Sequence, residues 1–158
     1  MVTIIYKTIS GNVKKSTVAI PVGFTAEDVE AAWECVKDAA KPRLQVEVPT
    51  STVQMEYTYH VKADKMVEKI ASLTKAAKTL CPDVEFSALD ATRAEKEFLC
   101  KALAEAIKAG AASVTLCDDA GVADAEEFGE FVKYVSENTE GIENVRVCFF
   151  NFVEQNKR

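Results

Sequence analysis

Histidine is nearly absent from this sequence, since His60 is the only one among 158 residues. A nucleophile–histidine dyad or a multi-histidine metal site would have to use that residue or borrow from another chain. The five cysteines are an odd number and include no C-x-x-C pair. We therefore expect reduced core thiols, as in a cytosolic protein, rather than a disulfide framework.

Long apolar runs and long basic runs are also lacking. No stretch approaches the ~20 apolar residues of a membrane span, and we see no signal-peptide core. The net charge is −6, from 25 acidic and 19 basic residues. These features predict no nucleic-acid partner, no membrane partner and a cytoplasmic location.

The composition that remains is that of an ordinary folded domain. Hydrophobic residues make up 48% of the chain and charged residues 28%. A chain of this length buries about 68–70% of the surface that it exposes when unfolded, which is enough for a core without disulfides or metal. We predict one domain over residues 1–158.

Strand-like and helix-like segments alternate along the chain. The expected strands are Thr17–Val22, Arg43–Val48, Val84–Ser87, Ser113–Cys117 and Val145–Phe150. The expected helices are Thr25–Ala40, Asp64–Leu80, a helix that begins at a Thr92–Glu95 capping box and ends at Gly110, and Ala123–Glu137. A Thr25–Asp28 capping box begins the first helix. Thr50–Ala63 is a long connection and a candidate functional loop, and Val2–Ser10 fits either a strand or an irregular helix.

This alternation predicts an α/β fold with parallel strands and right-handed crossovers. Two architectures fit. A flavodoxin-like, open, doubly wound sheet is natural for about 150 residues. A (β/α)8 barrel needs about 250 residues, so only part of one would be present. Periodicity does not distinguish the two.

Four stretches carry a family resemblance, namely Ser16–Glu34, Arg43–Tyr57, Leu80–Arg93 and Glu126–Val145. In order, they resemble strands three to seven of the catalytic barrel of the 2-isopropylmalate synthase and homocitrate synthase family, an HMG-CoA-lyase-like TIM barrel. The resemblance implies a half TIM-type barrel, with about five parallel strands and four or five helices, that lacks the first two strands and the last.

The resemblance also implies a chemistry, the condensation of acetyl-CoA with a 2-oxo acid on a divalent metal. The family carries a His-x-His pair of metal ligands on strand seven, where this chain has Cys148 and Phe150. A thiol can bind a soft metal, but a phenyl ring cannot be a ligand. We therefore expect no metal site and no cofactor.

Other family positions differ as well. Gln45 stands at a histidine position, Leu89 at the catalytic-site glutamate, and Asp119 at the threonine that holds the substrate carboxylate. A carboxylate at Asp119 would repel an anionic 2-oxo acid. The substrate-binding positions that the resemblance implies are Ser87, Gln45, Asp119 and Asn151.

Two further features have structural interpretations. Glu47 and Glu85, on neighbouring strands, could form an acid/base pair, but their alternation with apolar residues favours a polar layer that faces either a barrel-like interior or solvent. His60 is more typical of a loop residue than of a catalytic base.

The leading hypothesis is an isopropylmalate-synthase-like protein that has lost the condensation and acts as a non-catalytic remnant or as a binding or scaffold module. The alternative is a 2-isopropylmalate-synthase-type acyltransferase, active only after a partner supplies the missing strands. A third possibility is a binder of a small organic acid or a CoA-like molecule, which would use the loops at the carboxyl ends of the strands. Open barrel edges and the apolar last strand predict a homodimer or other self-association.

Overall fold

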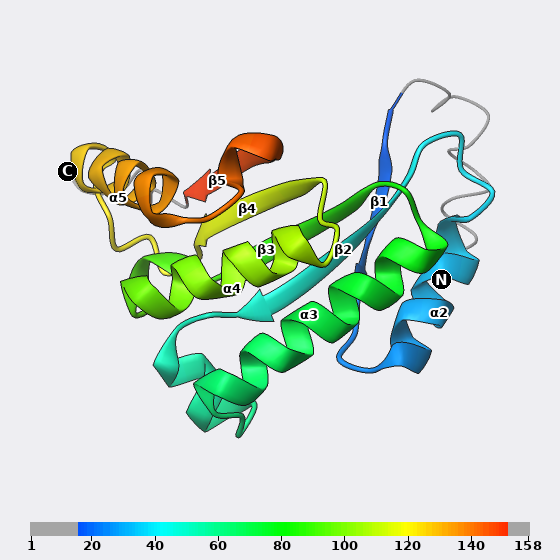
Figure 1. Cartoon of the computed structure of the whole chain (residues 1–158), viewed down its shortest axis with the longest axis horizontal. Helices are drawn as coiled ribbons and strands as arrows, with labels where there is room; N and C mark the ends of the chain where they lie inside the picture. The colour runs from blue at the N-terminus through cyan, green and yellow to red at the C-terminus, as the bar shows by residue number, and fades with distance from the viewer. Residues whose placement is uncertain (1–15, 152–158) are drawn as a thin grey trace.

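The computed structural model describes residues 16–151 and shows five strands that alternate with helices (Figure 1). The strands are β1 (Val18–Val22), β2 (Pro42–Pro49), β3 (Val84–Leu89), β4 (Ser113–Asp118) and β5 (Arg146–Asn151). The α-helices are α2 (Ala26–Val36), α3 (Ala63–Leu80), α4 (Lys96–Lys108) and α5 (Ala125–Asn138). Short helical turns are η1 (Gln54–Thr58), η2 (Ala91–Arg93) and η3 (Ile142–Asn144). The ambiguous segment Val2–Ser10 lies outside the described residues.

The strands form a single parallel sheet in the order β1-β2-β3-β4-β5. Because each crossover moves in the same direction and is right-handed, all the connecting helices lie on one face of the sheet. Figure 1 shows α2 to α5 along this face. A flavodoxin-like sheet reverses its strand order and carries helices on both faces. That alternative is therefore wrong, and the partial-barrel architecture is confirmed.

The apolar core lies between the sheet and the helices. Leu44, Val46, Phe86 and Leu116 point from the strands into this core and are fully buried. Ile70 of α3 and Leu99 and Leu103 of α4 are among the fully buried residues that pack against them. Fully burying a side chain of this kind contributes about 1.5–3 kcal/mol, so the helix-facing side of the sheet supplies most of the packing energy.

The first expected capping box is confirmed at the start of α2. The backbone N–H of Asp28 donates to Thr25 Oγ1 (3.2 Å), and the backbone N–H of Thr25 donates to the Asp28 carboxylate (3.0 Å). The helix ends at Val36, earlier than the expected Ala40, because residues 37–41 form turns and bends before Pro42 begins β2. Asp124 and Glu127 form a second capping box, at the start of α5.

The expected capping box at Thr92 is wrong. Asp90 adopts a left-handed backbone conformation (φ 56°), and a separate 3-10 turn, η2, follows it. The helix α4 therefore begins at Lys96, with Glu95 as an N-cap that makes no side-chain hydrogen bond. The Thr92 hydroxyl instead donates to Asp118 Oδ1 (2.6 Å) at the end of β4.

The connection between β2 and α3 is more ordered than expected. It contains the π-helical turn η1, whose Met55 is buried in the core. The ring of Tyr59 stacks on Phe24, with 4.7 Å between centroids. His60 lies in the loop after η1, with a backbone φ of 53°. The expectation that it is a loop residue is confirmed. Within residues 16–151, no helix is both long enough and apolar enough to cross a lipid bilayer.

Candidate functional site

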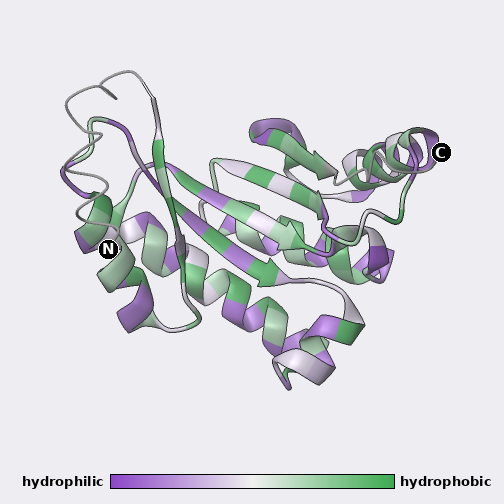
Figure 2. Ribbon diagram, turned by 180° about the vertical axis from the view of Figure 1, so that it is seen from behind, coloured by the Kyte–Doolittle hydropathy of each residue, from purple (hydrophilic) through white to green (hydrophobic). Residues whose placement is uncertain are grey.

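The sheet has an inner face, opposite the helices, that is formed by alternate residues of the strands. Figure 2 views the molecule from this side, with the strands in front of the helices. The parallel register places the inner-face residues of β2 to β5 in three layers. From the amino to the carboxyl ends of the strands, the layers are Gln45, Glu85, Ser113 and Arg146; Glu47, Ser87, Thr115 and Cys148; and Pro49, Leu89, Cys117 and Phe150.

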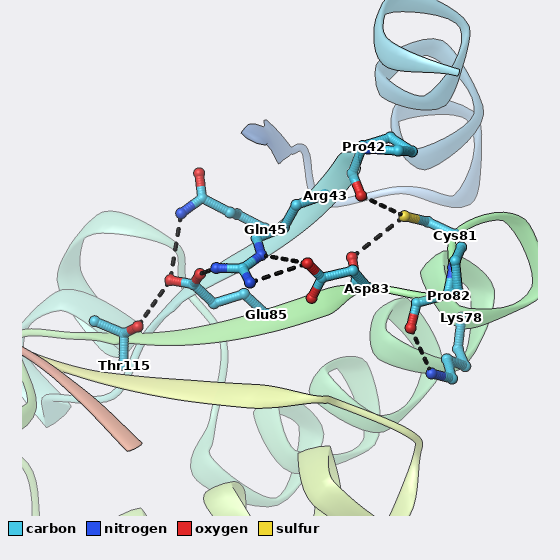
Figure 3. Close-up of polar contacts among 9 residues, drawn as sticks. All are labelled: Pro42, Arg43, Gln45, Lys78, Cys81, Pro82, Asp83, Glu85 and Thr115. Carbon is cyan, nitrogen blue, oxygen red and sulfur yellow. Dashed lines mark hydrogen bonds and ion pairs between the residues drawn. The ribbon is translucent and has the colours of Figure 1, made fainter. Parts of the chain in front are cut away.

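Glu85 is the centre of a polar network on the inner face (Figure 3). Arg43 Nη1 donates to one carboxylate oxygen of Glu85 (2.8 Å). The other oxygen accepts from Gln45 Nε2 (3.3 Å), Thr115 Oγ1 (2.7 Å) and Ser87 Oγ (3.2 Å). Burial disfavours the charge, but the hydrogen bonds from Thr115 and Gln45 and the charge of Arg43 outweigh it, so the pKa of Glu85 is lowered. Glu85 is therefore an ionised structural anchor.

Neighbouring contacts fix the amino end of this network. Arg43 also pairs with Asp83, whose Oδ2 lies 2.9 Å from Nη2. The thiol of Cys81 donates to the carbonyl oxygens of Asp83 (3.2 Å) and Pro42 (3.4 Å), as Figure 3 shows. These contacts tie the start of β2 to the start of β3.

Glu47 lies one layer further along β2 and has a different environment. Burial and the charges of Glu85 and Asp119 raise its pKa. Within the described part of the chain, no hydrogen bond or ion pair joins its side chain to another residue. The expected acid/base pair therefore consists of a carboxylate held ionised by Arg43 and a second carboxylate that lacks a cation. Both lie in the polar layers of the inner face, as their alternation with apolar residues predicted.

A second polar cluster lies at the carboxyl ends of the strands, around Asp90. Arg93 donates to both carboxylate oxygens of Asp90, from Nε (2.7 Å) and Nη2 (2.6 Å), and the hydroxyl of Ser51 donates to the same group. The backbone N–H of Asp90 donates to Asp119 Oδ2 (2.6 Å). These contacts link the ends of β2, β3 and β4 and occupy an oxygen of Asp119.

Both carboxylate oxygens of Asp118 also accept hydrogen bonds from other residues of the fold. It is completely buried and accepts from Thr92 Oγ1. The backbone N–H groups of Val122 (3.3 Å) and Ala123 (3.1 Å) donate to its two oxygens. Asp118 therefore holds the loop after β4 in place.

The structure brings the candidate site residues of the sequence together only in part. Ser87 and Gln45 share Glu85 as their acceptor. Asp119 lies beside Asp90 at the end of the sheet, and Asn151 ends β5. Leu89, Cys148 and Phe150 occupy the inner face in the two upper layers. Gln45, Ser87, Leu89, Cys148 and Phe150 thus share the inner face, whereas Asn151 is the register partner of Asp118 and has the opposite parity to Phe150. The side chains of Gln45 and Ser87 bond to Glu85, and that of Asp119 bonds to the backbone of Asp90.

Arg43 is the site residue that sequence reasoning missed. It alternates with Gln45 and Glu47 along β2, so the same period of two that identified Glu47 and Glu85 also places it on the inner face. The pairing of β2 with β3 then brings Arg43 near Asp83 and Glu85.

The residues present do not fit a divalent metal at the end of β5. Phe150 offers no donor atom, and Cys148 offers one sulfur, whereas Mg²⁺ and Mn²⁺ prefer oxygen ligands. Across residues 16–151, no group of three or more histidine, cysteine, aspartate or glutamate side chains is arranged to hold a metal ion. Burial, with the charges of Asp119, Glu47 and Glu85, raises the pKa of Cys117 to about 12, so this thiol is no nearby source of thiolate.

Comparison with known proteins gives one consistent result. The HMGL-like family model matches residues 4–149. Methylthioalkylmalate synthase 1-1, chloroplastic, of Eutrema japonicum is 43% identical over 147 residues, which cover 89% of this chain and 29% of that protein. The 2-isopropylmalate synthase of Carboxydothermus hydrogenoformans is 40% identical over 124 residues, 78% of this chain and 24% of that protein.

The fold comparison agrees. Hydroxymethylglutaryl-CoA lyase from Pseudomonas aeruginosa superposes with a TM-score of 0.68 at 16% identity, over 84% of this chain and 44% of that one. The chain thus spans less than a third of the curated relatives and less than half of the solved structure. Since the family model covers nearly the whole sequence, this chain belongs to the HMGL-like family.

Proposed function

We propose that this chain is a non-catalytic member of the HMGL-like family, a scaffold or binding module in which the acetyl-CoA condensation has been lost. The observation that carries the proposal is Phe150. By the resemblance it stands at a metal-ligand position, and its ring is on the inner face at the end of β5, with 49% of its surface exposed. No rotamer of phenylalanine can supply a donor atom, so a change of side-chain conformation would not restore that ligand.

Two further positions support the proposal. The amide of Gln45, at a histidine position of the family, is hydrogen-bonded to Glu85 and so is directed along the sheet. The carboxylate of Asp119, at the threonine position, accepts from the backbone of Asp90 and carries a charge that opposes an anionic substrate.

A thiol assay of CoA release tests the proposal. The purified chain is incubated with acetyl-CoA, 2-oxoisovalerate and Mg²⁺ or Mn²⁺, beside a relative such as a 2-isopropylmalate synthase as the positive control. We expect release no faster than the background hydrolysis of acetyl-CoA. Turnover that requires the 2-oxo acid and falls in Ser87→Ala would contradict the proposal, as would turnover that appears only when a partner chain is added. The second result would support the assembled acyltransferase.

We also propose a cytoplasmic location. All five cysteines are free thiols, as in a reducing compartment. Because the names of several relatives include the word chloroplastic, expression of a fluorescent fusion is the appropriate test. A diffuse cytoplasmic signal is expected, and accumulation in an organelle would contradict the proposal.

A further inference from the structure

A groove lies between α2 and α3, in the helix layer and away from the inner face of the sheet. The two helices lie side by side (Figure 1), and the groove has a volume of about 440 Å³. That volume is within the range of small-molecule sites. Its apolar lining comes from Ala26 of α2, Leu73 of α3 and the loop residues Phe24 and Val61. The groove can therefore accept an aliphatic group.

Phe24, which forms one wall of the groove, is held by two neighbouring side chains. Tyr59 stacks on its ring, with 4.7 Å between centroids. The ammonium of Lys69 lies 4.9 Å from the centroid of the same ring and donates to the Phe24 carbonyl oxygen (2.9 Å). These contacts join the loop before α2 to α3 and to the connection that precedes α3. The wall is therefore formed without a ligand, as in most small-molecule sites.

Lys69 carries a charge that the fold leaves uncompensated. Its side chain is partly buried, and within residues 16–151 no ion pair involves it. The charge of Lys69 contributes to lowering the pKa of Asp28, but that carboxylate bonds to Thr25 at the start of α2. An ammonium has three N–H groups, and the Phe24 carbonyl accepts one of them. A partly buried cation with remaining donors, at the wall of an apolar groove, favours an anionic ligand.

Two more polar residues of the groove lie on the same face of α3 as Lys69. Lys65 precedes it by four residues, and Ser72 follows it by three. Lys65 pairs with Glu68 (2.7 Å), but the two side chains are 71% and 65% exposed, and such surface pairs contribute little. Lys65 can therefore exchange Glu68 for the carboxylate of a ligand. With two lysines and one glutamate, the lining has a net positive charge.

We propose that the groove between α2 and α3 binds an aliphatic monocarboxylate, with the carboxylate on Lys69 and the hydrocarbon chain against Val61 and Leu73. The contact of an ammonium with a carboxylate is a charge-assisted hydrogen bond, which is stronger than a neutral one. The hydrocarbon chain leaves water for an apolar lining, which is favourable. The inference deepens the proposed function and rests on it, since it gives the binding module a class of ligand.

Isothermal titration calorimetry of the full chain with hexanoate tests the inference. We expect one hexanoate to bind per chain, with a Kd in the millimolar range. Hexanol and hexylamine lack the negative charge and should bind to the wild-type chain at least about tenfold more weakly. Lys69→Met removes the ammonium but keeps an apolar side chain, so it should raise the Kd for hexanoate about tenfold. Lys69→Arg keeps the charge and should hold the Kd within about threefold of wild type.

Lys75→Met is the matched control, since Lys75 is exposed on α3 but lies outside the groove. It should leave the Kd unchanged. Ala26→Leu reduces the volume of the groove and should weaken the binding of hexanoate and hexanol alike. Circular dichroism of each variant checks that it folds, and the comparison of hexanoate with hexanol requires no variant.

Three results would overturn the inference. They are the absence of hexanoate binding, binding of hexanol as tight as that of hexanoate, and equal weakening by Lys69→Met and Lys75→Met. The CoA-release assay reports separately on the proposed function. Failure of hexanoate to bind would leave the loss of catalysis unaffected, whereas CoA release would contradict that loss and leave the hexanoate result unchanged.

Discussion

Arg43 Nη1 lies 2.8 Å from Glu85 Oε2, so a buried ion pair joins two neighbouring strands on the inner face of the sheet. Both side chains are largely buried, with 15% and 9% of their surfaces exposed. Removing one partner of such a pair leaves an uncompensated charge in a poorly solvated place, which costs more than the pair itself contributes.

Arg43→Met should therefore destabilise the fold by about 2–4 kcal/mol, a range that allows for partial solvent access. The double variant Arg43→Met with Glu85→Gln should cost clearly less than the sum of the two single changes. Urea unfolding of the four proteins measures the coupling. Additive losses would mean that the ion pair contributes nothing specific.

Glu85 also predicts how stability depends on pH. In the folded state, the pKa of the Glu85 carboxyl lies below its usual value of 4.5. Because the folded pKa is the lower one, the stabilisation is complete above about pH 4.5 and is lost as the pH falls through the folded pKa. Glu85→Gln should be less stable than wild type at pH 7, and the difference should shrink in acid. Thermal unfolding between pH 7 and pH 3 checks this, and a constant difference would contradict it.

The corrected role of Thr92 gives a third prediction. Its hydroxyl donates to the buried carboxylate of Asp118 at 2.6 Å and does not cap α4. Thr92→Val should destabilise the fold by about 1.5–3 kcal/mol, as expected for a hydrogen bond to a charged group. Glu95→Ala should change stability by less than about 0.5 kcal/mol, as surface substitutions do. Chemical denaturation of both variants is the measurement. A large loss in Glu95→Ala would instead support the capping box.

Cys117 should be unreactive in the folded protein. It is 6% exposed, and its raised pKa of about 12 leaves almost no thiolate at pH 8. Treatment with iodoacetamide at pH 8, followed by mass spectrometry, should find Cys117 unmodified in the native protein and modified after unfolding in guanidinium. Rapid native modification would show that the upper layer of the inner face opens to solvent.

The sequence predicted the five strands and the four α-helices, because the spacing of apolar residues and the Thr25–Asp28 capping box are local properties of the chain. It could not separate a barrel from a doubly wound sheet, since both have the same alternation and differ only in strand order. The prediction that Thr92 and Glu95 cap α4 was wrong, because the left-handed conformation of Asp90 leads into a separate turn and α4 begins only at Lys96. The contacts of Glu85 with Arg43, Gln45 and Thr115 on neighbouring strands join residues 30 to 42 positions apart. Periodicity shows which side chains share a face but not which of them bond.

The most direct test of the proposed loss of catalysis is the binding of metal, because it requires no knowledge of the substrate. The purified chain is dialysed against Mn²⁺ at neutral pH, and bound metal is counted by mass spectrometry beside a 2-isopropylmalate synthase. With Phe150 and Cys148 at the end of β5, we expect no stoichiometric binding. Close to one equivalent of tightly bound Mn²⁺ per chain, reduced by Cys148→Ser, would contradict the account.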